Sequence, residues 1–276
     1  MVAPRTDKHR YSVLAMLFIA YLFNFLDRQL IGILAMPIQK ELALSDAQLG
    51  LMGGMAFALF YALLGVPAGW LADRCGRARV IGWSLALWSV CTAACGLAQG
   101  FWSLLTARMM VGVGEAGGVA PSYALITQYF GPQSRGRALA LYTMAIPVGS
   151  ALAMWLGGAL ASAWGWRMAF VVMGVAGLLF APLFFWVVRG DARTPTPSTP
   201  VDLRASLKLL LRQRSFWGLS VGAGFGSLIG YGMMFWLPSL FARRYGLRLP
   251  ETGEYMALLF LCGGLLGLGT GGWLAD

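Results

Sequence analysis

Four ionisable side chains interrupt otherwise apolar stretches of the sequence, and these residues could do chemistry. Asp27 and Arg28 stand in the first apolar stretch, and Arg108 and Glu115 stand in the fourth. At the centre of a bilayer a charged side chain costs about 2.5–3.5 kcal/mol on insertion scales, so such residues face a cavity and pair with one another. The carboxylates could exchange protons, and the guanidinium groups could hold an anion.

The depth of these residues can be estimated from the ends of the apolar stretches. At about 1.5 Å per residue, Asp27 and Arg108 both lie roughly 10–14 Å from the same membrane surface. Glu115 follows Arg108 by two helical turns on the same face, near the middle of the membrane. We therefore predict that Asp27 and Glu115 take up and release protons, and that Arg28, Arg108 and Glu115 contact a bound anion. The alternative is a fixed ion pair that joins the first and fourth helices.

Aromatic residues and prolines in the same region give further candidates. Tyr123 and Tyr142 could line a cavity, although aromatic residues in a membrane span often serve packing alone. Pro121, Pro147 and Gly149 are predicted hinges, because proline bends a helix and glycine eases movement.

The amino-acid composition indicates which class of protein carries these charged residues. The 276 residues are 58% hydrophobic and only 12% charged, with a mean hydropathy of +0.68, against about 25% charged residues in ordinary soluble domains. That balance excludes a soluble enzyme, a nucleic-acid-binding protein and a disordered chain, despite the net charge of +10. The four cysteines lack zinc spacing, so we expect no metal and no cofactor. An all-α polytopic membrane protein remains, and no enzyme is expected.

Eight apolar stretches are long enough to cross a bilayer, given that a span needs about 20 residues. We expect spans at residues 11–37, 47–72, 80–100, 101–129, 138–163, 168–188, 215–241 and 255–275. Most Lys and Arg residues between them fall on the side of the N-terminus, which places that side in the cytoplasm. We expect a multi-pass protein of the plasma (inner) membrane. Its N-terminal apolar stretch is expected to be retained as the first helix and not removed as a signal peptide.

A polar segment divides these spans into two groups. Residues 1–189 are predicted to form a six-helix bundle, 190–214 a cytoplasmic linker, and 215–276 a partial second bundle of two helices. The pentapeptide GWLAD occurs at 69–73 and again at 272–276, as in transporters built from two parallel repeats. We expect a fragment of a twelve-helix protein, the alternative being a natural eight-helix protein.

The first GWLAD copy lies within a motif that identifies a family. The run GVPAGWLADRCGRARV at 65–80 resembles the signature between the second and third helices of the major facilitator superfamily. It departs at Ala78, where a basic residue is usual. The resemblance implies the major facilitator fold, here a six-helix N-terminal half followed by the first two helices of the C-terminal half. It also implies a cytoplasmic gate, formed by Gly69, Asp73, Arg74, Gly76 and Arg77.

A second set of motifs resembles the spinster-like branch of that superfamily. RMMVGVGEAGGVAP at 108–121, the block at 130–153 and Asn24–Arg28 carry this resemblance. It implies a monomeric carrier in the lipid bilayer that moves a lysolipid-like or other amphiphilic anion by alternating access, coupled to protons. A proton-coupled small organic-anion symporter or a drug-type exporter of the same superfamily is the alternative. A non-transporting membrane scaffold or receptor is the alternative of another class.

Overall fold

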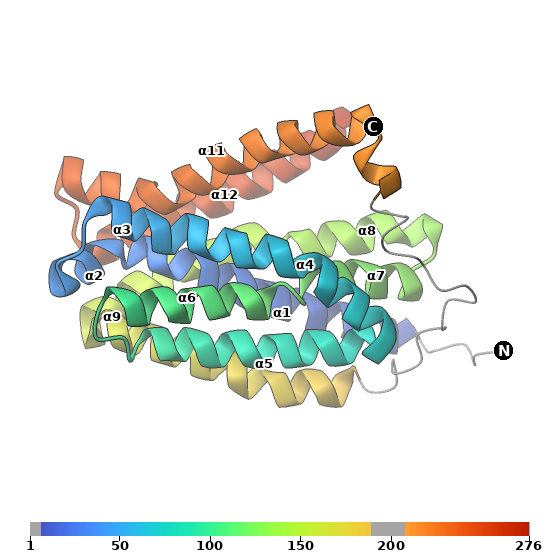
Figure 1. Cartoon of the computed structure of the whole chain (residues 1–276), viewed down its shortest axis with the longest axis horizontal. Helices are drawn as coiled ribbons and strands as arrows, with labels where there is room; N and C mark the ends of the chain where they lie inside the picture. Colours follow the sequence, from blue (N-terminus) through green and yellow to red (C-terminus); the bar gives the residue numbers. More distant parts are fainter. Residues whose placement is uncertain (1–6, 189–207, 276) are drawn as a thin grey trace.

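The computed structural model describes residues 7–188 and 208–275 as an elongated bundle of helices (Figure 1). No strand occurs in these ranges, and the predicted all-α fold is confirmed. In chain order the elements are α1 (Asp7–Ile33), α2 (Ala35–Leu42), α3 (Asp46–Gly50), the π-helical turn η1 (Leu51–Met55), α4 (Ala56–Cys75), α5 (Arg77–Cys95), α6 (Phe101–Glu115), α7 (Val119–Tyr129), α8 (Pro132–Thr143), α9 (Ala145–Val187), α11 (Arg214–Tyr245) and α12 (Leu249–Ala275).

Each of the eight predicted spans corresponds to helix. By length and composition, the helical stretches that could cross a membrane are Lys8–Ile33, Asp46–Cys75, Arg77–Cys95, Pro132–Val187 and Arg214–Tyr245. The fourth of these contains two predicted spans, because α9 is interrupted at Gly165, whose φ of +83° lies outside the helical region. The remaining predicted spans are α6 with α7, and α12.

Three predicted spans are broken: the first where we expected continuous helix, and the fourth and fifth near Pro121 and Pro147, which we predicted as hinges. The first ends at Ile33 and resumes as α2, and the fourth divides into α6 and α7. In both cases a proline, Pro37 or Pro121, is the third residue of the new helix. A proline lacks the N–H that would bond to the carbonyl four residues earlier, so the preceding helix stops and the proline occupies the first turn of the next one.

The same rule locates the bend near Pro147. This proline is the third residue of α9, and the break lies at Met144, between α8 and α9. Gly149 lies in regular helix, where an added Cβ would stand 2.7 Å from the main-chain oxygen of Leu22. Gly149 therefore allows α9 to pack closely on α1, and its role as a hinge stays a prediction.

The core lies around α1, which is the most enclosed of the long helices. In the most apolar 18-residue stretch of α1, 61% is buried inside the bundle, whereas the corresponding share for α11 is 17%. The bundle has two ends, which we call the Asp46 end, where α3 begins, and the Asp73 end, where α4 meets α5 (Figure 1). The predicted division into 1–189, 190–214 and 215–276 stays a prediction, and residues 189–207 of the linker lie outside the described ranges.

Candidate functional site

The four charged residues lie together inside the bundle. Asp27 and Arg28 project from α1, and Arg108 and Glu115 project from the facing α6. Asp27 and Arg108 are each 1% exposed, and Glu115 is fully buried. The carboxylates therefore point into the protein and away from its outer surface.

Arg28 links the two groups of helices at this depth. Its Nε donates to Oε2 of Glu115 at 2.6 Å, and its Nη1 donates to the hydroxyl of Tyr231 on α11 at 3.2 Å. The guanidinium also lies over three aromatic rings. Its carbon stands 5.2 Å from the ring centre of Phe25, 5.1 Å from that of Phe57 and 4.4 Å from that of Tyr61. Such contacts stabilise a cation that has few water molecules around it.

Asp27 and Arg108 interact through the main chain of Asp27. Nη1 of Arg108 donates to the main-chain carbonyl of Asp27 at 3.3 Å, and its guanidinium lies over Phe57 at 5.5 Å. Within the described ranges, Oδ1 of Asp27 and Oε1 of Glu115 are buried without a hydrogen-bond donor. Buried polar atoms without partners are rare in folded proteins and call for an explanation.

Asn24 stands one helical turn before this group on α1. Neither atom of its side-chain amide has a hydrogen-bond partner among the described residues. It borders a small cavity of about 10 Å³ with Tyr21 and Ser122, which is close to the space that one water molecule needs.

The two tyrosines predicted to line the cavity, Tyr123 and Tyr142, differ in exposure. Tyr142 is 1% exposed and stacks on Tyr21, with ring centres 4.4 Å apart. Tyr123 meets the edge of Tyr142 at 5.5 Å and is 36% exposed. In this conformation Tyr123 is open to its surroundings, whereas Tyr142 is covered.

The predicted gate residues form a turn at the Asp73 end. Gly76 adopts a φ of +98°, which favours glycine, and this lets α5 start directly after α4. Nη2 of Arg77 pairs with Oδ1 of Asp73 at 3.2 Å, and Nη1 donates to the carbonyl of Ala124 on α7 at 3.3 Å. Arg74 lies over the ring of Trp70 at 3.9 Å.

Gly69 precedes this turn on α4, and an added Cβ there would meet nothing within 4 Å. Within the described ranges, the hydrogen-bond, ion-pair and ring partners of Asp73, Arg74 and Arg77 belong to helices α4 to α7. A contact between this turn and α11 or α12 stays a prediction.

Sequence reasoning missed the aromatic residues around Arg28. Phe57 and Tyr61 are four residues apart on α4 and so share one helix face, a signal that could have indicated them. Tyr231 carried no such signal, because it lies beyond the linker and reaches Arg28 only through the packing of α11 on α1.

Comparisons with known proteins agree with this architecture. Residues 17–276 match the profile of the Major Facilitator Superfamily. An "MFS-type efflux pump" of Mycolicibacterium smegmatis is 35% identical over 275 residues, which cover 98% of this chain and 64% of the pump. A "Hexuronate transporter" of Bacillus subtilis is 27% identical over 277 residues, which cover 98% of this chain and 65% of that transporter.

Among solved structures, a bacterial homolog of the human lysosomal transporter Spinster, in an inward-facing and occupied conformation, superimposes with a TM-score of 0.83. It is 33% identical and covers 98% of this chain, and 62% of that structure is matched. The similarity agrees with the spinster-like motifs of the sequence. The chain thus spans somewhat less than two thirds of the length of these relatives. Since the profile covers far more than half of its residues, this multi-pass membrane protein belongs to the major facilitator superfamily of transporters.

Proposed function

We propose that this chain takes part in secondary active transport of an organic anion, with protons as the coupling ion and with alternating access as the mechanism. The observation that carries the proposal is the double contact of Arg28, which pairs with Glu115 on α6 and also donates to Tyr231 on α11. A buried cation that joins two groups of helices can sense both an anion and a movement of the helices.

Competition for Arg28 supplies the coupling. An anionic substrate and the Glu115 carboxylate cannot both pair fully with one guanidinium. When Glu115 binds a proton its charge disappears, and Arg28 becomes available to the substrate. Asp27 is the second proton-binding group, since its Oδ1 is buried without a donor among the described residues. Arg108 holds the main chain at Asp27 and positions that carboxylate.

The substrate class follows from the guanidinium and from the relatives. A guanidinium binds carboxylate and phosphate groups through paired hydrogen bonds. The similarity to the hexuronate transporter supports the proposal that the substrate is a carboxylate. A lysolipid-like amphiphilic anion is the second candidate, favoured by the spinster-like motifs and by the similarity to the Spinster homolog. Tyr123, with its exposed ring, is the aromatic residue best placed to meet either substrate.

The remaining expectations belong to the same proposal. The Asp73–Arg77 turn acts as the cytoplasmic gate of a monomer in the plasma membrane, with the N-terminus in the cytoplasm. The break at Met144 before Pro147 lets the first part of the fifth span move relative to α9.

Uptake into proteoliposomes tests the proposal. The purified protein is reconstituted and offered radiolabelled hexuronate, hexonate and lysophosphatidate at several pH gradients. We expect one of these anions to accumulate when the outside is acidic. Glu115→Gln should remove the dependence on the pH gradient and Asp27→Asn should reduce it. Arg28→Lys should weaken substrate binding by about tenfold or more, because lysine cannot form the paired hydrogen bonds.

Glu251→Gln serves as the matched control, since Glu251 is a carboxylate that pairs with Arg248 at the Asp46 end, away from the site. Unchanged pH-driven uptake in Glu115→Gln would refute coupling through competition for Arg28, and unchanged uptake in Asp27→Asn would refute the coupling role of Asp27. Binding of an anion without any uptake would favour the alternative that the protein is a non-transporting membrane scaffold or receptor.

A further inference from the structure

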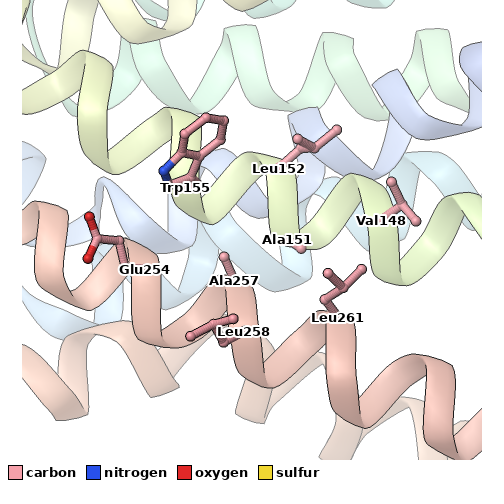
Figure 2. Close-up of a pocket in the computed structure, with 8 residues that line it drawn as sticks. All are labelled: Val148, Ala151, Leu152, Trp155, Glu254, Ala257, Leu258 and Leu261. Atoms are coloured by element: carbon pink, nitrogen blue, oxygen red, sulfur yellow. The ribbon is translucent and has the colours of Figure 1, made fainter.

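A groove runs along the junction of α9 and α12, on a different face from the charged site. Its volume is about 430 Å³, within the range of small-molecule pockets. Figure 2 shows Trp155 and Glu254 near one end of the groove, and Val148 and Leu261 near the other. Leu152 and Leu258 line the wall between them.

The packing of α9 shows that the groove is separate from the buried charges. Gly149 and Gly157 of α9 face α1, where an added Cβ would approach Leu22 and Leu30. Val148, Leu152 and Trp155 occupy another stripe of the same helix, at 3.6 residues per turn. A ligand in this groove would therefore not touch Arg28 or Glu115.

The two ends of the groove differ in chemistry. Glu254 is the acidic residue of the lining, and the lining contains no cationic side chain. Within the described ranges no ion pair is formed by Glu254, whereas Glu251, one turn earlier, pairs with Arg248 at 2.6 Å. The rest of the lining is apolar apart from the indole N–H of Trp155.

The position of the carboxylate suits an amphiphile in a bilayer. Glu254 lies five residues into α12, or about 7.5 Å from the Asp46 end of that helix, and Leu261 lies about 10 Å deeper. Trp155 stands at the level of Glu254, since its neighbour Met154 contacts Gly253. It lies ten residues before the turn at Gly165, or about 15 Å along α9, and its ring attracts quaternary ammonium groups.

We infer that this groove binds a single-chain cationic amphiphile, with the ammonium group between Glu254 and Trp155 and the alkyl chain along Leu152, Leu258 and Leu261. An anionic amphiphile would place its charge against the Glu254 carboxylate. A zwitterionic phospholipid would bring a phosphate that finds no cation in the lining.

Photo-crosslinking in nanodiscs tests the inference. The 276-residue chain is placed in phosphatidylcholine nanodiscs with a dodecyltrimethylammonium that carries a diazirine at the end of its chain, and labelled peptides are identified by mass spectrometry. We expect labelling within residues 148–155 and 254–261. Glu254→Gln should lower it by about fivefold, since an exposed carboxylate and a cation–π contact are each modest. The control Glu251→Gln should leave it unchanged.

Two further measurements keep the test decisive if Glu254→Gln folds poorly. Tetramethylammonium should compete for labelling of the unaltered protein more strongly than sodium at equal ionic strength. A dodecyl sulfate carrying the same diazirine should label the groove less than the cationic probe does. Equal labelling by both probes, or labelling that Glu254→Gln leaves unchanged, would overturn the inference and leave a lipid-covered apolar surface. Neither readout depends on transport, so the proposed function can fail independently.

Discussion

The two ends of the molecule hold α11 very differently. At the Asp46 end, Arg243 of α11 donates to Asp46 and to Gln39, and Phe235 packs against α1. At the Asp73 end, every residue from 217 to 230 of α11 is exposed. Helix α11 is therefore joined firmly to the first six spans at one end only (Figure 1).

This difference teaches which contacts determine the conformation. The Asp46 end combines exposed ion pairs with close backbone packing, where Gly253 of α12 meets the main chain of Met154 and Gly158 meets that of Leu249. The Arg28–Tyr231 hydrogen bond lies between this end and the free part of α11. A carrier that alternates must break the first set of contacts and form others at the Asp73 end, so each set can be tested separately.

The largest effect is expected in the middle, at the buried ion pair. Arg28→Met leaves the Glu115 carboxylate buried without its partner, which should destabilise the protein by about 3–5 kcal/mol. The double variant Arg28→Met with Glu115→Met should recover most of that loss, because two apolar side chains can replace a buried pair. Thermal unfolding in detergent measures both. A single variant that is as stable as the parent would show that water already reaches Glu115.

Glycine substitutions compare the packed end with the free helix. An added Cβ at Gly253 would stand 2.5 Å from the main-chain oxygen of Met154, whereas one at Gly226 would meet nothing within 4 Å. We expect Gly253→Ala to cost about 1–3 kcal/mol through overpacking. Gly226→Ala should stabilise α11 by about 0.5–1 kcal/mol. A loss of stability in Gly226→Ala would mean that this face of α11 is covered by protein.

The exposed pair at the Asp46 end should affect conformation more than stability. Arg243→Gln removes the donors to Asp46 and Gln39, and the melting temperature should fall by only about 2 °C or less, as for other surface pairs. Distances between spin labels on α3 and α11 should nevertheless broaden. Arg244→Gln is the matched control one residue later. An unchanged distance distribution in Arg243→Gln would assign closure of this end to helix packing alone.

The smallest effect is a pH dependence of the same end. Glu41 on α2 accepts a hydrogen bond from Nε1 of Trp166 at 2.5 Å and pairs with Arg167, and these contacts hold the pKa of Glu41 below its usual value. A lowered pKa stabilises the folded state above the unfolded pKa of about 4.3. That contribution disappears as the pH falls through the folded value. Melting temperatures measured down to pH 3 should therefore decline less in Glu41→Gln than in the parent.

The sequence predicted the secondary structure and the burial of the charges well, for a physical reason. Apolar runs of span length can satisfy their backbone only as helices, and charged residues within them must face inward. The breaks before Pro37 and Pro121 were less predictable, because proline in a span can either bend a helix or divide it. Tyr142 shows the limit for single residues, since the position of an aromatic ring on a helix does not tell whether it packs or stays open.

The sequence by itself determined that the chain is a helical membrane protein, that it carries a balanced set of four buried charges, and that its motifs resemble those of the major facilitator superfamily. These properties are local, because each depends on residue types along one helix. Only the tertiary structure decided that Arg28 pairs with Glu115 and reaches Tyr231, that Arg108 holds the main chain of Asp27, and that α9 and α12 leave a groove beside Glu254. Those contacts join helices far apart in sequence, and they depend on rotations and close approaches of whole helices that no local pattern encodes.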